Sequence, residues 1–309
     1  MNDIYDTSHL IERAGTFRRL LSELFDCGDH NQIVLTPGIL IALRELFSVL
    51  TVRQLLLTDR EYYPADYFPA QDAQVCQVDK FVDAVCRSKP QAVLASVVTW
   101  DGEELPVREW FCHIRQQLGR QCPLLIADYS HAGAAGFTSV RGLEADLVCG
   151  DPAKWITDQQ QSKLAFLSFR SRDLMRHAHQ VFAPYFLALE GHAPECAARW
   201  VDPAEICSIC NWCESRAIKR SDLFDCHRKN LNLAQALSDR WAMPAKPQTG
   251  ILSISDEPDD PLFKTLDEVG LVWRHPTGSI RVKCRSDILD SANLRFMTNG
   301  AATETISFG

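Results

Sequence analysis

Residues 123–155 contain two apolar runs that are each followed at once by polar residues, PLLIADYSHAG at 123–133 and ADLVCGDPAKW at 145–155. Short apolar runs bounded by polar residues or glycine are typical of buried β-strands. The first run ends at Asp128, with His131 three positions later, and the second run precedes Lys154. Ligands of open α/β sheets bind at the carboxyl ends of the strands, so we expect these three side chains to belong to a functional site.

Four more apolar runs of this kind occur elsewhere, at residues 32–36, 54–58, 91–98 and 164–169. Apolar residues at helical spacing occur over residues 8–26, 38–50, 79–88 and 106–118. Strands that are apolar on both faces and alternate with helices indicate a mainly parallel sheet that is covered on both sides. The sequence therefore predicts a large α/β domain over residues 1–185.

The pattern loosens after residue 185, and the remainder predicts a smaller α+β domain over residues 186–309. A long helix is expected over residues 220–241. The stretches TGILSIS, GLVWRH and SIRVKC then predict short strands, and ILDSANLRFM follows near the end.

Composition and charge limit the class of protein. The 309 residues are 46% hydrophobic and 23% charged, which is typical of a globular chain, and the net charge of −8 argues against a nucleic-acid-binding face. No run approaches the roughly 18 uncharged apolar residues that a membrane-spanning helix requires. The 12 cysteines are scattered through apolar segments, as reduced thiols are. We therefore expect a cytoplasmic protein with no nucleic-acid or membrane partner.

One group of cysteines stands apart, in the stretch CSICNWC. Cys207, Cys210 and Cys213 recur at intervals of three, and Cys226 follows. Thiolates at this spacing can converge on zinc or on an iron–sulfur cluster. The same spacing places them on one buried stripe of a helix, and we favour this packing role over a metal site.

The segment from Leu124 to Trp155 resembles the cofactor segment of the class V aminotransferases, which include cysteine desulfurases and kynureninases. In that family an Asp ends a strand, a His or Gln follows three positions later, and the cofactor lysine follows at the spacing seen here between Asp128 and Lys154. The resemblance implies a fold-type I transferase that depends on pyridoxal 5′-phosphate. Its large domain is expected to contain a mainly parallel sheet, and its smaller C-terminal domain to be α+β.

The resemblance also implies roles for these residues, and their chemistry suits the roles. Lys154 would carry pyridoxal phosphate as a Schiff base and then move the substrate's α-proton. The Asp128 carboxylate would keep the pyridine nitrogen protonated, and His131 would lie beside the ring and contact its phenolic oxygen. Taken singly, Asp128 could cap a turn, His131 could be a loop histidine, and Lys154 could be a surface lysine.

Further positions match the family less closely. The stretch VLTPGILIAL joins a strand to a helix through Thr36 and Gly38, where free N–H groups and the helix dipole favour a phosphate. The stretch EYYPADYFPAQ is similar to a kynureninase segment and places Tyr63 where an aromatic ring stacks on the cofactor. The stretch SVVTWDGEE resembles a strand end of the family, and this resemblance places Thr99 where a polar side chain reaches the cofactor's oxygen. An ordinary capping turn at Thr36 and core packing of Tyr63 are the alternatives.

The stretch TGSIRVKCRSDI resembles the family element whose arginine binds the substrate's α-carboxylate. A bidentate guanidinium suits this anion, so Arg281 is the candidate and Arg285 the alternative, with a surface salt bridge as the competing role. Two positions depart from the family, which has a His or Tyr directly before the lysine and a Ser or Thr three residues before the lysine. Ala153 and Asp151 stand there, and a carboxylate repels a phosphate.

The sequence thus predicts an enzyme that acts on a small amino-acid substrate by lyase, hydrolase or desulfurase-type chemistry in a biosynthetic pathway. Transamination is the alternative within the same class. A non-catalytic relative that acts as a partner or scaffold is the alternative outside it. The resemblance further implies a homodimer.

Overall fold

The computed structural model describes residues 7–132, 139–152, 154, 164–176, 203–274 and 278–285. The chain divides into two compact units, one of residues 1–100 with 104–223 and the other of residues 101–103 with 224–309. The expected boundary between residues 185 and 186 lies outside the described residues. Among the described residues, no helix combines the length and the apolar character needed to cross a membrane.

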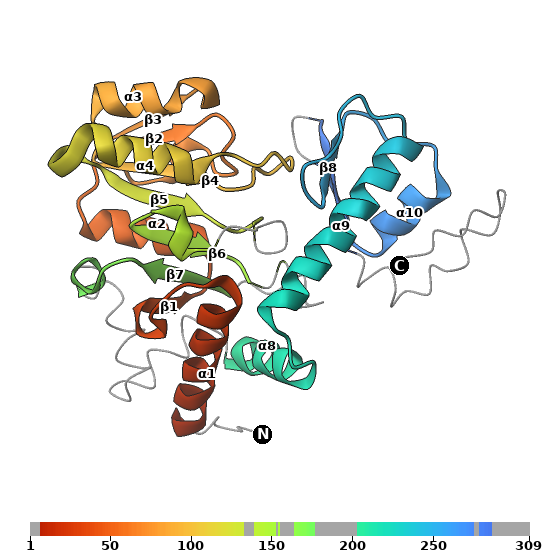
Figure 1. Cartoon of the computed structure of the whole chain (residues 1–309), viewed down its shortest axis with the longest axis horizontal. Helices are drawn as coiled ribbons and strands as arrows, with labels where there is room; N and C mark the ends of the chain where they lie inside the picture. The colour runs from red at the N-terminus through yellow and green to blue at the C-terminus, as the bar shows by residue number, and fades with distance from the viewer. Residues whose placement is uncertain are drawn as a thin grey trace. The chain divides into compact units, whose positions relative to one another are not determined.

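The first unit is built on a seven-stranded sheet with the strand order β1-β7-β6-β5-β4-β2-β3 (Figure 1). Its strands are β1 (Ile33–Thr36), β2 (Gln54–Thr58), β3 (Asp72–Cys76), β4 (Ala92–Ser96), β5 (Leu124–Asp128), β6 (Leu147–Gly150) and β7 (Ala165–Phe169). Strand β7 runs antiparallel to both of its neighbours, and all other neighbouring strands are parallel. The predicted α/β class and mainly parallel sheet are confirmed.

Strand β3 is absent from the sequence prediction. It lies at one end of the sheet order, pairs only with β2, and has no fully buried residue. An edge strand in contact with water does not need a continuous apolar run, so the sequence DAQVC carries little strand signal.

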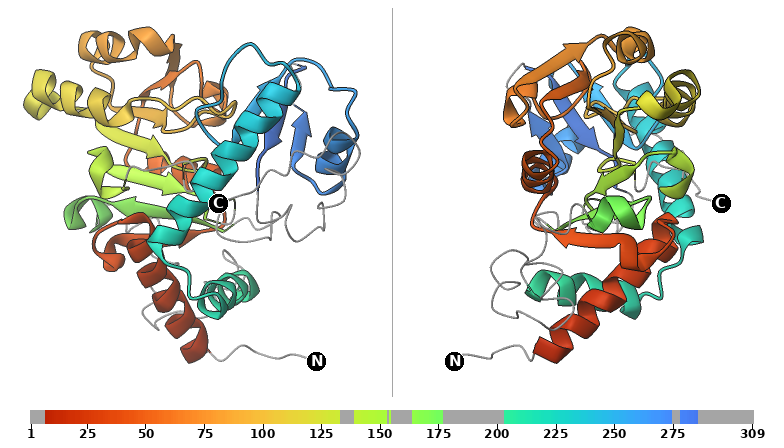
Figure 2. Two further views of the ribbon diagram at one scale, coloured as in Figure 1. Left: turned by 45° about the vertical axis from the view of Figure 1, so that its right-hand side comes forward. Right: turned by 90° about the vertical axis from the view of Figure 1, so that its left-hand side faces the viewer.

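Helices cover both faces of this sheet (Figure 2). They are α1 (Thr7–Phe25), α2 (Ile39–Val49), α3 (Phe81–Ser88) and α4 (Val107–Leu118), and α8 (Pro203–Ser215) packs against α1. The short 3₁₀ turns are η1 (His30–Gln32), η2 (Ala65–Tyr67), η3 (Val78–Lys80), η4 (Gly119–Gln121) and η5 (Arg141–Leu143). The apolar residues of α2 pack in one cluster with Val34, Leu94, Ile126, Leu147 and Cys149 of the sheet. These alternate strand positions therefore define the face of the sheet that α2 covers.

The described part of the second unit contains a three-stranded antiparallel sheet, in the order β8-β10-β9, and two helices. Its elements are α9 (Arg220–Arg240), which begins in the first unit, then β8 (Ile251–Ile254), α10 (Pro261–Glu268), β9 (Val272–Arg274) and β10 (Ile280–Lys283). Leu237, Leu252, Phe263 and Val282 belong to its core. The expected long helix and three strands are confirmed, and the stretch ILDSANLRFM lies outside the described residues.

One buried carboxylate holds the helices of this unit together. Asp260 caps the amino end of α10 by accepting a hydrogen bond from Leu262 N at 2.9 Å. The same carboxylate accepts bonds from Arg240 Nη2 at 3.0 Å and Trp241 Nε1 at 2.9 Å, at the end of α9. Its hydrogen bond with Arg240 is the largest cause that lowers the pKa of Asp260 to about 2. Asp260 therefore joins a helix cap to a tertiary contact.

We expect Asp260→Ala to destabilise the second unit by about 2 kcal/mol, because it removes a helix cap and leaves the Trp241 N–H without its acceptor. Urea unfolding followed by circular dichroism measures this loss. Asp259→Ala, at the exposed neighbouring position, is the matched control and should leave the midpoint unchanged. Equal midpoints for the two variants would contradict the anchoring role of Asp260.

Candidate functional site

Two polar side chains and a thiol lie side by side at the carboxyl ends of adjacent strands. The register pairs Ser96 of β4 with Asp128 of β5, and Asp128 with Cys149 of β6. Each is two residues beyond a strand residue that packs in the α2 cluster, so all three lie on the face covered by α2. A polar row at the carboxyl edge of a parallel sheet is the place where such folds bind ligands.

Asp128 is buried, with 6% of its surface exposed, and its carboxylate is oriented by the turn that follows β5. Ser130 N donates to Asp128 Oδ1 at 2.8 Å, and the Ser130 hydroxyl donates to the same oxygen. None of the residues that the structure describes donates a hydrogen bond to Oδ2. One carboxylate oxygen is therefore held by the protein, while the other can accept a hydrogen bond from a ligand.

Glu61 is a second carboxylate at this edge, and the sequence analysis missed it. Its Oε1 accepts hydrogen bonds from Ser96 N at 2.9 Å and Thr58 Oγ1 at 2.8 Å, and its Oε2 accepts one from Ser96 Oγ at 2.5 Å. Burial raises the pKa of Glu61 to about 7 against the lowering effect of these bonds, and the charge of Asp128 raises it further. Glu61 and Asp128 therefore lie within electrostatic range of each other.

Tyr63 follows two residues later and is partly buried. Its ring packs edge-on against the rings of Tyr62 at 4.9 Å and Phe68 at 6.5 Å between centroids. Burial is the main cause that raises the pKa of Tyr63, followed by the carboxylate of Asp128. The structure thus brings the phenol of Tyr63 near Asp128.

His131 is also buried, with 6% exposed, in the turn that β5 enters. This turn is closed by a hydrogen bond from Ala132 N to Tyr129 O at 3.0 Å. Tyr129 points to the opposite face of the sheet, where its ring meets Phe25 of α1 at 5.7 Å. Neighbouring residues of a strand point to opposite faces, so Asp128 is directed away from α1.

Lys154 follows β6 and is paired with Asp151. Lys154 Nζ lies 3.8 Å from Asp151 Oδ2, and the two side chains are 30% and 18% exposed. Cys149 of β6 pairs in register with Asp128 of β5, and the pKa of its thiol responds to the charges around it. Burial raises the pKa of Cys149, the charges of Asp128 and Glu61 raise it further, and the charge of Lys154 lowers it. The amine and both carboxylates therefore act on one buried thiol. Ala153 lies outside the described residues.

Thr36 and Gly38 connect β1 to α2 at the same edge of the sheet. Thr36 pairs with Ala165 of β7, whose neighbour Phe166 pairs with Gly150 at the end of β6. Thr36 is fully buried, and its hydroxyl has no hydrogen-bond partner among the described residues. Gly38 has φ of 148° and immediately precedes the 11 residues of α2. A buried hydroxyl and a helix amino end are suitable groups for binding an anion.

The remaining predicted positions fall in different places. Thr99 is fully buried and lies three residues beyond the end of β4. Arg281 belongs to β10 of the second unit, where its guanidinium stacks on the Trp273 ring at 4.9 Å. Arg285, the alternative, is fully buried in the same unit. Asp128 and Lys154 thus follow the neighbouring strands β5 and β6, and the charge of Asp128 acts on Tyr63, whereas Arg281 belongs to the other compact unit.

The cysteine group lies on helix α8. Cys210 and Cys213 are buried, and the Cys210 thiol lies 3.6 Å from the carbonyl oxygen of Arg13 on α1. Within the described part of the chain, no group of three or more His, Cys, Asp or Glu residues is arranged to hold a metal ion. The buried thiols contribute to the contact between α1 and α8.

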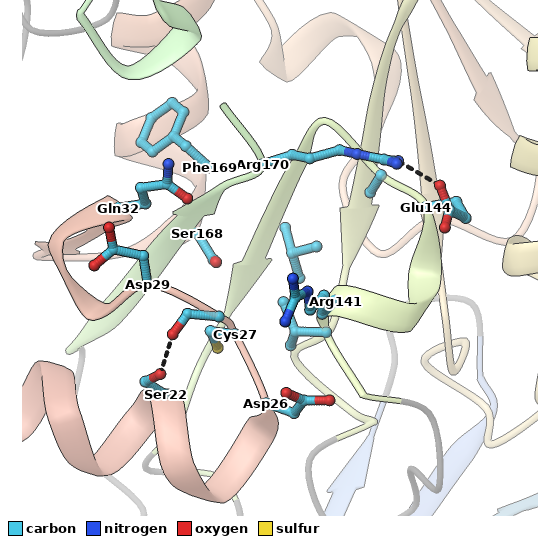
Figure 3. Close-up of a pocket in the computed structure, with 14 residues that line it drawn as sticks. Ser22, Asp26, Cys27, Asp29, Gln32, Arg141, Glu144, Ser168, Phe169 and Arg170 are labelled. Carbon is cyan, nitrogen blue, oxygen red and sulfur yellow. Dashed lines mark hydrogen bonds and ion pairs between the residues drawn. The ribbon is translucent and has the colours of Figure 1, made fainter. Parts of the chain in front are cut away.

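A polar pocket of about 600 Å³ lies at the opposite, amino-terminal edge of the sheet (Figure 3). It is lined by the end of α1, by η1 and η5, and by the adjoining ends of β6 and β7. Its carboxylates are largely paired, with Glu144 bonded to Arg170 at 2.5 Å and Asp29 to Arg172 at 2.9 Å. None of the predicted site residues lines it, so the chemistry of the strand ends lies elsewhere.

The chain matches no protein-family model and no curated protein by sequence. Solved structures do share its architecture. A lysine-to-alanine mutant of C-DES, with glycine covalently linked to the PLP cofactor, has a TM-score of 0.68 at 15% identity, over 95% of this chain and 87% of that chain. Ureidoglycine-glyoxylate aminotransferase from Bacillus subtilis has a TM-score of 0.65 at 13% identity, over 96% and 87%.

A third structure is cystathionine gamma synthase from Xanthomonas oryzae pv. oryzae in complex with aminoacrylate and cysteine. Its TM-score is 0.58 at 13% identity, over 89% of this chain and 82% of that chain. At these identities the likeness establishes the fold. The predicted fold-type I architecture is therefore confirmed, and the chain has the fold of pyridoxal-phosphate-dependent enzymes.

The raised pKa of Glu61 predicts how stability depends on pH. The folded state holds the Glu61 proton more tightly than the unfolded state, so this stabilisation is complete below about pH 4.5 and is lost as the pH rises to about 7. As the pH rises over this range, the wild type should therefore lose a few kcal/mol of unfolding free energy relative to Glu61→Gln, which does not titrate. Urea titrations at several pH values measure it, and a constant difference would contradict the assignment.

Proposed function

We propose that this chain binds pyridoxal 5′-phosphate at the carboxyl edge of its sheet and acts as an enzyme on an amino-acid substrate. The observation that carries the proposal is the position of Asp128 at the end of β5 and of Lys154 just beyond β6, which is its neighbour in the sheet. Asp128 is paired in register with Cys149 of β6, and Lys154 follows Cys149 by about one turn of chain beyond the end of that strand, which supports one shared ligand.

The donor set fits several parts of the cofactor. Lys154 would hold it covalently through Nζ, and Asp128 Oδ2 would accept the hydrogen bond of a protonated ring nitrogen. Tyr63 supplies an aromatic face near Asp128. The buried hydroxyl of Thr36 and the amino end of α2 after Gly38 would hold the phosphate. His131 and Thr99, both buried, would contact the ring's oxygen.

When bound, pyridoxal phosphate supplies an electron sink for negative charge at the substrate's α-carbon. Asp128 would sustain that property, because a carboxylate beside the ring nitrogen favours its protonated form. The Lys154 amine would be the group that accepts and returns the substrate's α-proton. The Asp151 carboxylate lies 3.8 Å from this amine and forms an ion pair with it.

For the reaction we propose lyase, hydrolase or desulfurase-type chemistry at the substrate's β-carbon. C-DES is a cystine C-S lyase, as its complex with cysteine persulfide is described. Arg281 of the second unit would bind the substrate's α-carboxylate, and a homodimer would form in the cytoplasm.

Transamination is the second candidate, because ureidoglycine-glyoxylate aminotransferase has a similar fold. Detection of a 2-oxo acid without loss of the β-substituent would favour it.

We expect purified protein incubated with pyridoxal phosphate to absorb at about 420 nm, as lysine-bound cofactor does, and Lys154→Ala to lose this band. Borohydride reduction followed by peptide mass spectrometry should place the label on Lys154. Lys80→Ala, at an exposed lysine of the same unit, is the control and should keep the band. A protein without the band would favour the non-catalytic partner or scaffold, and a band retained in Lys154→Ala would refute the site.

Asp128→Asn should bind the cofactor but lower α-proton exchange with deuterated solvent by about 100-fold or more, because a neutral amide cannot hold the ring nitrogen protonated. Proton NMR of a simple amino acid such as alanine measures the exchange. Asp72→Asn, on the exposed edge strand β3, is the matched control. Exchange at the wild-type rate in Asp128→Asn would show that this carboxylate does not serve the ring.

A further inference from the structure

The carboxylate of Glu61 ties the loop after β2 to the end of β4. It accepts one hydrogen bond from Thr58, the last residue of β2, and two from Ser96, the last residue of β4. Strands β2 and β4 are parallel neighbours, so a single side chain bridges their carboxyl ends. All three bonds lie between 2.5 and 2.9 Å.

The same loop is held on its other side. Asp59 N donates to Cys76 O at 2.8 Å, and Asp59 Oδ1 accepts a bond from Val78 N at 3.0 Å, both at the end of β3. The chain is therefore fixed at residues 58, 59 and 61, immediately before Tyr63. With its backbone restrained in this way, the Tyr63 ring has little freedom to leave its place beside Asp128.

Even the partial burial of the Glu61 carboxyl group is unfavourable by itself. The groups shown to act on it are two hydroxyls, one backbone N–H and the like charge of Asp128, and no cation is among them. Burying a carboxyl beside another carboxylate is costly, so a role that depends on this group accounts for its presence better than general packing does.

We infer that Glu61 is a positioning residue, which holds the loop after β2 against β4 so that Tyr63 presents its ring at the cofactor edge beside Asp128. This inference rests on the proposed function, because Tyr63 needs a cofactor ring to stack on. Glu61 itself contacts Thr58 and Ser96 and acts through the loop. The tether operates through hydrogen bonds, and a glutamine can make most of them because the Ser96 hydroxyl can turn to accept.

Four variants test the inference: Glu61→Ala, Glu61→Gln, Tyr63→Ala and the double variant with alanine at both positions. The first readout is the dissociation constant of pyridoxal phosphate. The second is the induced circular dichroism of the bound cofactor, which depends on the orientation of its ring. The third is amide hydrogen exchange over residues 58–63 in cofactor-free protein. Glu45→Ala, at an exposed glutamate of α2, is the control.

We expect Glu61→Ala to weaken cofactor binding about tenfold, to change the induced dichroism and to speed exchange over residues 58–63. Glu61→Gln should stay within about threefold of the wild type. The double variant should bind the cofactor about as weakly as Tyr63→Ala alone, because Glu61 acts through Tyr63. If Glu61→Ala does not fold, Ser96→Ala, which removes only one of the three bonds, should show the same changes to a smaller extent.

Wild-type affinity and dichroism in Glu61→Ala would overturn the inference, and so would fully additive effects of the Glu61 and Tyr63 variants. Cofactor binding by Glu61→Gln as weak as that by Glu61→Ala would also overturn it, because the affinity would then depend on the charge of Glu61 and not on its hydrogen bonds. Failure of the proposed function is separate, since wild-type protein would then show no cofactor band at all, and the inference would fall with it.

Discussion

The register between β4, β5 and β6 is the constraint on which the site depends. Backbone hydrogen bonding sets Ser96, Asp128 and Cys149 side by side. Because side chains alternate across a strand, a slip of one residue in β5 would turn Asp128 toward α1 and put Tyr129 in its place. The apolar residues packed under α2 oppose such a slip, since it would expose the core of the sheet. Packing of the interior thus determines the chemistry at the edge.

Asp128 and Glu61 repel each other at the end of an apolar sheet, and the structure stabilises the two carboxyl groups in different ways. Asp128 receives both of its hydrogen bonds from Ser130, the residue two positions later, whereas Glu61 receives its three from the ends of two strands. Burial and the nearby charge of Asp128 raise the pKa of Glu61 to about 7. The pair can therefore share less than two full negative charges near neutral pH, which reduces their repulsion.

The fold is common to enzymes of several reactions, so the distinctive properties of this chain lie in its own residues. The carboxylate of Asp151 lies beside the Lys154 amine, where the resemblance led us to expect a hydroxyl that binds phosphate. The buried Thr36 hydroxyl and the amino end of α2 offer another place for an anion at the same edge. Such a difference in side chains is compatible with an unchanged sheet, because strand register is set by backbone hydrogen bonds and not by the Thr36 hydroxyl or the Asp151 carboxylate.

The sequence by itself determined most of the elements and the positions of two candidate site residues along them. Its apolar runs and helical spacing predicted six of the seven strands of the large sheet, and therefore that Asp128 and Lys154 follow strands. It missed β3, whose exposed edge needs no apolar run, and Glu61, whose partner Ser96 is 35 residues away. Only the tertiary structure decided that β5 and β6 are neighbours and that Glu61 joins β2 to β4. Periodicity reports which side of one element is buried, whereas contacts between elements depend on strand order and register, which no local pattern encodes.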